Sequence, residues 1–573
     1  MNTSNYPKYY NCLLILCLLF TFPLYSHPQD FLARKIPKRE TRAVWLTTLD
    51  GLDWPSCKAL SVSGIEKQKH ELTAILDSLQ RVNINTVLFQ ARIRGTVVYP
   101  SSIEPWDACL TGVPGRNPGY DPLAFAIKEC HRRGMEIQAW VVAIPLGGWN
   151  SPGCKSLRNK HTGIVIRHRG QGYIDPSRPA SAQYIAGLCS EIASRYDIDG
   201  IHLDYIRYPE TMRGVNHATA RQNITRIVEV VRDRVKAIKP WLKLSCAVIG
   251  KRDDLARTHS YGWNAFDAGR QDVETWMRRG LVDQLYPMMY FRGDQFYPFL
   301  LDWKENDYNC EIIPGLGIYM LSPHEGHWPT EEIERQMLVS RSLGMGFALF
   351  REKFLRNYAK TIYSFMKEFS PYPSFVPPSH KDSTAIAAPA TINVERTGNY
   401  AVVTWKDCTL SGLRHNVYVS NTYPVDTDNA QNLLVMKVEG NRIAAKVQDD
   451  MYFAVTAIDR FGRESEATQQ DIPAYTHTNE KPGIPLIDVV AGENVMMPEP
   501  FNRQSTDAVI IKNIVGTDVG VRPCIGGLFA TKGLPYGFYA VYSLNQKGIM
   551  HRMFFLKIIP KKTSENVLTP CTA

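Results

Sequence analysis

The chain has 573 residues, which is too long for one ordinary domain and predicts two to four. With 44% hydrophobic and 21% charged residues, its composition is that of a soluble globular protein with ample material for a large core. The formal net charge of +10 is spread along the chain without a long block of lysine and arginine. It therefore indicates a solvated basic surface and argues against a nucleic-acid-binding tract.

An apolar segment lies near the N-terminus. The run CLLILCLLFTFPLYS follows soon after Lys8 and is succeeded by polar residues. Its length fits the apolar region of a signal peptide cleaved after Ser26 and is short for a membrane span. A lipid anchor at Cys17 is disfavoured because the apolar run continues beyond it. We therefore predict a signal peptide over residues 1–26, no integral membrane span, and an exported protein that is periplasmic, cell-surface or secreted.

The cysteines show no metal-binding pattern. Of the twelve, two lie in the N-terminal segment, and no CxxC or Cys/His spacing occurs among the other ten. Three in helix- or strand-like patterns are expected to be buried apolar side chains: Cys130, Cys189 and Cys246. Three in loop-like sequence could form a bridge after export, with a pairing that the sequence leaves open: Cys57, Cys109 and Cys154.

From about residue 42 to residue 366, short apolar strands alternate with amphipathic stretches. Eight candidate strands are found, over residues 42–48, 84–90, 136–143, 199–204, 243–250, 282–290, 311–319 and 346–350. The stretches between them carry apolar residues at helical spacing, and several begin with a capping residue. This pattern predicts an α/β fold, a (β/α)8 TIM barrel over residues 40–370. A doubly wound sheet is the alternative, but it ordinarily uses fewer strands, and no GxGxxG loop follows the first one.

The composition and the pattern of apolar residues change after Lys367. Residues 371–386 are rich in proline and serine and are predicted to be a linker. Alternating strands follow, and Trp405, Tyr418 and the hairpin YFAVTAIDRFGRES resemble a fibronectin type III β-sandwich over residues 387–475. Residues 476–573 are predicted to be a further β-rich region of unassigned type. Neither region shows a catalytic constellation.

The fourth strand ends in the stretch IDGIHLDYIRYP, which turns from apolar to polar. Side chains alternate along a strand, so Ile201 and Leu203 are expected to pack on the outer helices. His202 and Asp204 would then point into the barrel. In a TIM barrel the carboxyl ends of the strands form the active-site face, which makes Asp204 the foremost candidate for catalysis.

Other strands also end in polar or aromatic residues. Trp45 lies on the first strand, Trp140 on the third and Tyr290 at the end of the sixth. Arg92 follows the second strand, and an unpaired guanidinium inside a barrel is costly, so it should meet a rim carboxylate or an acidic substrate. Aromatic faces with polar groups between them suit a sugar. We predict six substrate-binding residues: Trp45, Arg92, Trp140, His202, Arg207 and Tyr290. The aromatic residues could equally fill the barrel, and His202 could be a satisfied interior histidine.

Cleavage of a glycosidic bond ordinarily takes two carboxyl groups. We predict Asp204 as nucleophile or base, because a neighbouring Arg207 would favour its ionised form. For the second carboxyl group, Asp294 after the sixth strand and Glu352 after the eighth rank ahead of the loop acids Asp50 and Asp53.

Three motifs carry a family resemblance. RAVWLTTLDGLDWPS, GIHLDYIRYP and QLYPMMY resemble the glycosyl-hydrolase-like family 10 proteins over about residues 40–370. The resemblance implies an exported bacterial TIM-barrel glycosidase, and a characterised relative cleaves peptidoglycan strands that have lost their stem peptides. A weaker likeness is to chitinase-type barrels with DGxDxDxE on the fourth strand. Ile206 stands where their catalytic glutamate would be, which argues against that mechanism, although Tyr290 matches their tyrosine.

The sequence thus predicts an exported glycoside hydrolase that acts on a bacterial polysaccharide or an amino-sugar glycan, including peptide-free peptidoglycan strands. No metal or organic cofactor is expected. A non-catalytic carbohydrate-binding scaffold is the main alternative, because the acid that partners Asp204 is ambiguous. A lytic or transglycosylase reaction in the same pocket is the third.

Overall fold

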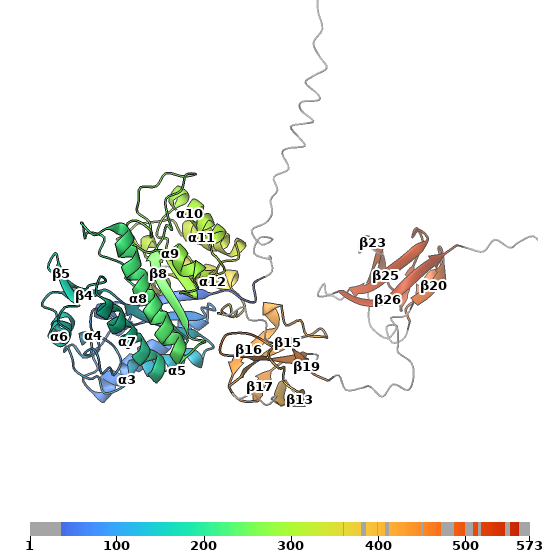
Figure 1. The fold of residues 1–573 in the computed structure, drawn as a ribbon. Helices are drawn as coiled ribbons and strands as arrows, with labels where there is room; N and C mark the ends of the chain where they lie inside the picture. Colours follow the sequence, from blue (N-terminus) through green and yellow to red (C-terminus); the bar gives the residue numbers. More distant parts are fainter. Residues whose placement is uncertain are drawn as a thin grey trace, which may run out of the picture. The chain divides into compact units, whose positions relative to one another are not determined.

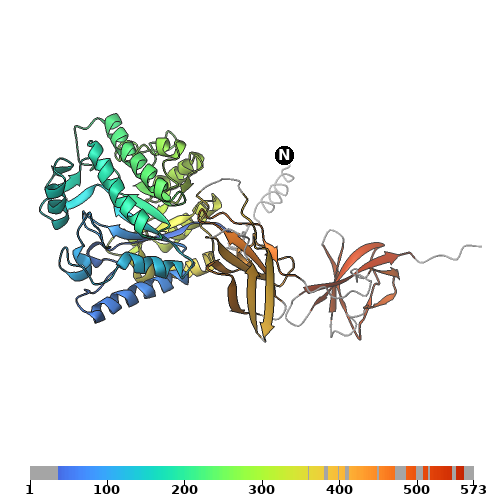
Figure 2. The same cartoon turned by 60° about the horizontal axis from the view of Figure 1, so that its bottom comes forward.

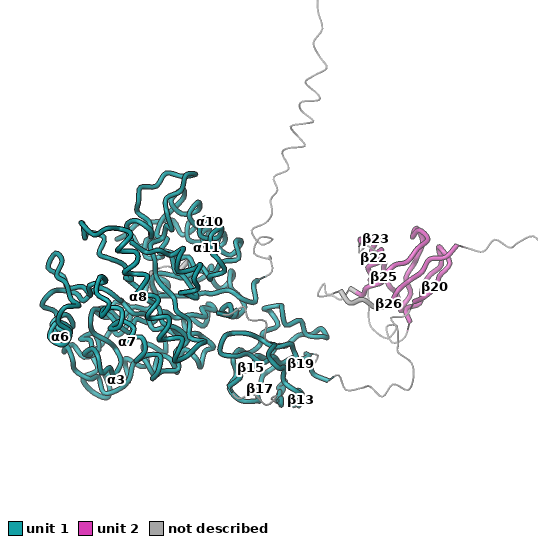
Figure 3. Tube along the Cα trace, in the orientation of Figure 1, with its two compact units in different colours: residues 1–471 teal, residues 472–573 magenta. Residues whose placement is uncertain are grey.

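The computed structural model divides the chain into two compact units, residues 1–471 and residues 472–573 (Figure 3). The structure describes residues 36–358, 360–379, 385–397, 399–406, 412–447, 451–471, 486–498, 508–513, 517–544 and 550–560. The predicted signal peptide, residues 1–26, lies outside the described residues. Within the described part of the chain, no helix combines the length and the apolar character that a bilayer crossing requires.

A closed parallel barrel forms most of the first unit. Its strands are β1 (Arg42–Leu46), β2 (Thr86–Arg92), β3 (Glu136–Val142), β7 (Gly200–Asp204), β8 (Lys243–Ile249), β9 (Gln284–Met288), β10 (Glu311–Ile312), β11 (Gly315–Leu316) and β12 (Phe347–Leu349). They follow one another in the order β10-β9-β11-β12-β1-β2-β3-β7-β8, and β9 also pairs with β8, which closes the ring. The short strands β10 and β11 share one position beside β9, so the barrel has the predicted eight positions. The predicted TIM barrel is confirmed.

Helices surround the barrel (Figures 1 and 2). The main ones are α3 (Val62–Gln80), α5 (Pro122–His131), α7 (Pro179–Arg195), α8 (His217–Ile238), α9 (Val273–Arg278), α10 (Tyr297–Glu305), α11 (Thr330–Ser342) and α12 (Lys360–Phe369). Several begin at the expected capping residues. Ser61 accepts a hydrogen bond from the amide of Gly64 at the start of α3, and Asp121 accepts one from Ala124 at the start of α5. Such caps satisfy backbone N–H groups that have no partner within the helix.

The alternation along β7 places its side chains as the sequence predicts. Ile201 and Leu203 are fully buried in the apolar core shared with the outer helices. His202 points inward, where its Nε2 accepts a hydrogen bond of 3.1 Å from Trp45 Nε1. Trp45 belongs to a separate apolar cluster inside the barrel, together with Trp140 and Tyr286. The barrel is therefore filled by side chains, as expected for this fold.

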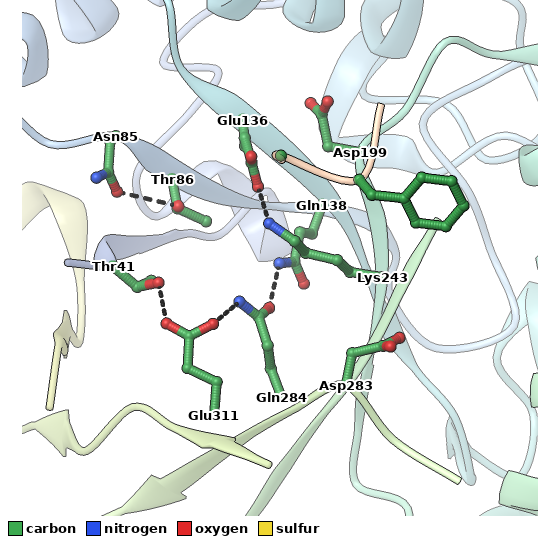
Figure 4. A network of polar contacts seen from close by, with 12 residues as sticks. Thr41, Asn85, Thr86, Glu136, Gln138, Asp199, Lys243, Asp283, Gln284 and Glu311 are labelled. Atoms are coloured by element: carbon green, nitrogen blue, oxygen red, sulfur yellow. Dashed lines mark hydrogen bonds and ion pairs between the residues drawn. The ribbon is translucent and has the colours of Figure 1, made fainter. Parts of the chain in front are cut away.

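Near the amino-terminal ends of the strands the barrel interior is polar (Figure 4). Glu136 and Lys243 form an ion pair of 2.6 Å, and both are buried. Gln284 joins Gln138 to Glu311 through hydrogen bonds of 2.7 Å each. Because these buried groups hold one another, this layer meets the requirement that polar groups away from water be paired.

A small excursion separates β3 from β7. It contains the antiparallel sheet β4 (Pro145–Gly148), β6 (Gln171–Ile174) and β5 (Val165–His168), with α6 (Pro152–Lys160) between β4 and β5. It follows the carboxyl end of β3 and therefore lies on the side of the barrel where the parallel strands end. His168 Nε2 lies 2.9 Å from the hydroxyl of Thr211, which ties the excursion to the loop after β7.

A β-sandwich completes the first unit. One sheet has β13 (Thr391–Thr397), β14 (Tyr400–Lys406) and β17 (Arg442–Lys446), and the other has β16 (Leu433–Val438), β15 (Arg414–Ser420), β18 (Tyr452–Ile458) and β19 (Thr468–Gln469). Trp405 of one sheet and Val417 of the other share a core, so the predicted sandwich is present, and its fibronectin type III identity stays a prediction. The sandwich contacts the amino-terminal side of the barrel: Lys437 Nζ lies 3.0 Å from Glu136 Oε1. The predicted linker, residues 371–386, is described only in part.

The second unit is also β-structure, as predicted. Its larger sheet has β20 (Leu486–Val490), β26 (Met550–Ile559), β25 (Gly537–Leu544), β22 (Ala508–Asn513) and β23 (Asp518–Pro523), and its smaller one pairs β21 (Asn494–Met496) with β24 (Leu528–Ala530). Val509, Val541 and Phe554 are fully buried in its own apolar core.

The thiols of the described cysteines are all free. Cys130, Cys189 and Cys246 are fully buried, as the sequence predicts. Cys57, Cys109 and Cys154 form no disulfide bond in the structure.

Candidate active site

A cavity of about 630 Å³ opens at the carboxyl ends of the barrel strands. Its walls come from segments that follow β1, β2, β3 and β7, together with the ends of β9 and β12 and part of the excursion. Four of the predicted site residues line it: Trp140, Asp204, Arg207 and Tyr290. A cavity of this volume is in the range of small-molecule sites and can hold sugar rings. It lies at the end of the barrel where TIM barrels carry their active sites.

Asp204 is the last residue of β7 and is almost entirely buried. Its Oδ2 accepts a hydrogen bond of 3.0 Å from Trp140 Nε1, and its Oδ1 accepts one of 2.6 Å from the amide of Tyr205. Burial raises the pKa of Asp204, and the charge of Arg207 and the two hydrogen bonds offset this only in part. The charge of Arg207 favours the ionised form of Asp204, as expected, but desolvation is the larger effect on its pKa.

Glu210 is a second carboxyl group in the same cavity, and the sequence prediction missed it. Its Oε1 accepts a hydrogen bond of 2.7 Å from Arg207 Nε. Partial burial would raise the pKa of Glu210, but the charge and the hydrogen bond of Arg207 outweigh it and hold the pKa below its usual range. Glu210 directly follows the motif IRYP, so a search of the loop after β7 for a second acid could have found it.

Tyr205 lies between Asp204 and Arg207 in the cavity wall. It has a left-handed backbone, with φ of 49°, and its side chain is 44% exposed. The Arg207 guanidinium lies over its ring, 4.2 Å from the centroid. A non-glycine residue with positive φ costs free energy, and such strain persists mainly where structure or function requires it. The exposed ring gives the cavity an aromatic face that the sequence prediction did not include.

Tyr290 follows β9 and lines the cavity. No described residue accepts or donates a hydrogen bond at its buried hydroxyl. Its ring packs against Tyr319 and Phe350, with centroids 5.5 Å and 5.4 Å away. Tyr290 is thus held in place by aromatic contacts while its hydroxyl remains available to a ligand.

Arg92 does not line the cavity, contrary to the predicted contact with substrate. It is buried and forms a two-fold hydrogen-bonded pair with Glu104, at 2.8 Å and 2.6 Å. A bulge in β2 causes this, since the pairing shifts from Gln90↔Trp140 to Arg92↔Val141. Arg92 therefore sits level with Val141, which packs in the outer core, instead of facing the barrel interior. The anion that Arg92 requires is supplied by the protein itself.

Trp45 and His202 also lie away from the cavity lining. Both are buried in the barrel interior, and His202 Nδ1 lies 2.8 Å from the hydroxyl of Ser245. Burial lowers the pKa of His202 to about 3, so its ring is neutral at physiological pH. The structure places these two residues as interior packing beneath the site, which was the alternative left open for them.

The two acids ranked first as partners of Asp204 are not brought to it. Asp294 is exposed in η2 (Gly293–Gln295), outside the cavity lining. Glu352 is fully buried but does not line the cavity, and its Oε1 accepts a hydrogen bond of 3.0 Å from Arg356 Nε. Burial raises the pKa of Glu352 to about 7, against which the charge of Arg356 acts only in part.

The loop acids after β1 are also outside the cavity lining. Asp50 is exposed in η1 (Leu49–Gly51). Asp53 is buried, accepts a hydrogen bond of 2.9 Å from the amide of Thr47, and pairs with Arg351. Asp53 therefore acts as a structural carboxylate that fixes the loop after β1 and positions Arg351. In the described part of the chain, no cluster of three or more His, Cys, Asp or Glu side chains is arranged to hold a metal ion.

Residues 40–222 match the family model described as Glycosyl hydrolase-like 10. This part of the barrel is therefore similar to the glycosyl hydrolase-like family 10 proteins. The match includes β1 and β7 and therefore two of the three motifs, together with Trp140, Asp204, Arg207 and Glu210. The third motif, on β9, lies beyond it.

Curated relatives agree with this family. The chain is 29% identical over 348 residues to Glycosyl hydrolase YngK of Bacillus subtilis (strain 168), which covers 55% of this chain and 68% of the relative. It is also 29% identical over 365 residues to Glycosyl hydrolase DigH of Escherichia coli (strain K12), covering 55% of this chain and 83% of that protein. The family resemblance seen in the motifs is confirmed.

Solved structures resemble the chain only distantly. Alpha-L-fucosidase isoenzyme 2 from Paenibacillus thiaminolyticus has a TM-score of 0.38 and 13% identity, over 58% of this chain and 48% of that chain. An alpha-galactosidase from Thermus thermophilus has a TM-score of 0.35 and 12% identity, over 66% of this chain and 68% of that chain. Both TM-scores are below 0.5.

Proposed function

We propose that the protein is a glycoside hydrolase in which Asp204 donates a proton to the leaving oxygen and Glu210 acts as nucleophile or base. One observation carries this proposal: two carboxyl groups line one cavity, and their surroundings shift their pKa values in opposite directions. Such opposed environments separate an acid from a base at a single pH. The usual glycosidase mechanism needs that pair.

Asp204 suits the role of acid. Burial favours its protonated form in the free protein. When the proton leaves, the carboxylate that forms is stabilised by the two donors already in place, Trp140 Nε1 and the amide of Tyr205. Donors that are positioned before the charge develops lower the barrier without reorganising during the reaction.

Glu210 suits the complementary role. Arg207 keeps Glu210 ionised, and the Glu210 side chain is 31% exposed, so water or a sugar ring can reach it. Arg207 also acts electrostatically on Asp204, so one guanidinium is coupled to both carboxyl groups. An ionised carboxylate can either attack the anomeric carbon or remove a proton from water.

A bacterial polysaccharide or an amino-sugar glycan is the proposed substrate. The rings of Trp140, Tyr205 and Tyr290 line the cavity and offer faces on which pyranose rings can stack. Peptide-free peptidoglycan strands are the leading example, and the family resemblance is what supports them. The apolar N-terminal segment supports export to the periplasm or the cell exterior.

The test is to incubate the full chain with peptide-free glycan strands and measure new reducing ends. We expect products from the unaltered protein and none above background from Asp204→Asn or Glu210→Gln. Asp294→Asn is the matched control, because Asp294 is exposed outside the cavity. Binding without any product would overturn the proposal in favour of a carbohydrate-binding scaffold. Anhydro-sugar or transfer products would indicate a lytic or transglycosylase reaction instead.

A further inference from the structure

Two guanidinium groups in the cavity have hydrogen-bond donors that the proposed reaction does not use. Arg94 follows β2, is exposed and lines the cavity. Within the described residues, no hydrogen bond or ion pair holds its guanidinium. Arg207 is buried and gives its Nε to Glu210, while its Nη1 is also buried and has no partner among the described residues. A buried donor without a partner is costly, so the site is incomplete as it stands.

The third arginine of the cavity differs from these two. Arg351 lines the wall but is paired with Asp53, a carboxylate that lies outside the lining. Its charge is therefore already compensated by the protein. Arg207 is also paired, with Glu210, but its Nη1 has no partner among the described residues, and Arg94 has no ion-pair partner there.

Arg94 and Arg207 both act on one aromatic residue, Tyr205. The Arg207 guanidinium stacks over Tyr205 at 4.2 Å, and the charge of Arg94 acts on the hydroxyl of the same tyrosine. Gly147 of β4 supports Arg94 from the excursion: a Cβ at Gly147 would lie 3.4 Å from Arg94 Cδ. The arrangement thus combines a face for a sugar ring with two donors for an anion.

We propose that Arg94 and Arg207 form a subsite for a carboxylate of the substrate, so that the glycan contains sugar units with a free carboxyl group. Guanidinium groups bind carboxylates through paired, charge-assisted hydrogen bonds. The inference rests on the proposed function and adds a substrate class to it. The carboxylate can belong to a uronic acid or to an acidic ether substituent of an amino sugar, and both present the same chemistry to the arginines.

The acidic groups of the cavity do not oppose such a ligand. Glu210 is neutralised by its pair with Arg207, and burial favours the protonated form of Asp204. Arg94 itself has no carboxylate partner among the described residues, so its charge is available to an anion. Conversion of the substrate carboxylate to an amide or an alcohol removes its charge and should remove the preference.

The experiment compares one glycan in two forms, with free carboxylates and with the same carboxylates reduced to alcohols. Peptide-free peptidoglycan strands and oligouronides are tested as separate sources. For the full chain, on whichever of the two glycans is its substrate, we expect kcat/KM to be about tenfold to a hundredfold higher for the acidic form than for the reduced form. Arg94→Gln should lower that ratio by about tenfold, and Arg94→Lys should lower it less because the charge is kept. Arg116→Gln, at an exposed loop position outside the cavity lining, should leave the ratio as it is.

Binding of the same glycans to the Asp204→Asn chain, measured by calorimetry, separates the two proposals. A preference for the acidic form without turnover by the unaltered protein would contradict the hydrolase and keep the subsite. Turnover with equal rates on the acidic and reduced forms would contradict the subsite and keep the hydrolase. A preference that Arg94→Gln leaves intact would also overturn the subsite.

Discussion

The indole Nε1 of Trp140 donates a hydrogen bond of 3.0 Å to Oδ2 of Asp204. Trp140 comes from β3 and Asp204 from β7, and these neighbouring strands pair in parallel with Val142 opposite Asp204. Strand register thus brings the donor and the acceptor together at the mouth of the barrel. This contact fixes the carboxyl group that we propose as the proton donor.

Trp140→Phe tests this contact because it keeps an aromatic ring and removes the donor. Loss of one hydrogen bond to the charge that develops on Asp204 should lower kcat by about tenfold with little change in KM. Steady-state kinetics on glycan strands is the measurement. Trp405→Phe is the control, since Trp405 lies in the sandwich core and its Nε1 has no partner among the described residues. An unchanged kcat in Trp140→Phe would contradict the role given to the contact.

The pH dependence of kcat/KM follows from the opposed carboxyl groups. Asp204 must be protonated, so activity is lost as the pH rises through its raised pKa. Glu210 must be ionised, so activity is lost as the pH falls through its lowered pKa. In Arg207→Gln both pKa values rise because a positive charge is lost, and both limbs of the profile should move to higher pH. Arg207→Lys retains the charge and should move them less; limbs that stay in place or move to lower pH in Arg207→Gln would refute the assignment.

The sequence was sufficient to predict the barrel because the pattern of strand followed by helix repeats along the chain. Apolar strands at regular intervals, each followed by a capped amphipathic helix, determine the closed sheet. The alternation along β7 also determined which way Ile201 and Asp204 face, since a strand has a period of two.

The same rule gave the wrong position for Arg92. A single bulged residue in β2 reverses the alternation, and the sequence does not mark it with glycine or proline. Glu104, which forms the ion pair with Arg92, lies on a loop, and the path of that loop depends on tertiary packing.

The second carboxyl group illustrates another limit. Asp294 and Glu352 follow strands, as a catalytic acid often does, but the chain turns the first outward and buries the second beside Arg356. Glu210 was overlooked because only loop geometry brings it into the cavity with Asp204. Strand positions are predictable from pattern, whereas the positions of loop side chains depend on contacts distant in sequence.

Glu352→Gln should change how stability depends on pH. The pKa of Glu352 is raised from 4.5 to about 7 in the folded protein. A raised pKa means that its contribution to stability is complete below pH 4.5 and is lost as the pH rises through 7. Relative to Glu352→Gln, the unaltered protein should therefore lose about 3 kcal/mol of unfolding free energy between these limits. Urea unfolding at several pH values measures this, with the exposed Glu331→Gln as control. A constant difference across that range would contradict the burial of Glu352.

Lys437→Met tests the attachment of the sandwich to the barrel. Lys437 Nζ lies 3.0 Å from Glu136 Oε1, and Lys243 holds the other oxygen of the same buried carboxylate. Loss of one partner should lower the unfolding free energy by about 1–3 kcal/mol at neutral pH. Burial would raise the pKa of Glu136, but the two lysines hold it below its usual value, so the difference should shrink as the pH falls.

The exposed Lys446→Met is the control for that measurement, because Lys446 lies on the same sandwich away from Glu136. Equal losses in the two lysine variants would indicate that the ion pair with Glu136 contributes nothing specific.

The most direct test of the central claim is the release of reducing ends from peptide-free glycan strands by the full chain and by Asp204→Asn, with circular dichroism to confirm that both are folded. The account predicts steady product formation by the unaltered protein and a loss of at least about a hundredfold in the variant. Near-equal turnover by the two proteins would contradict it.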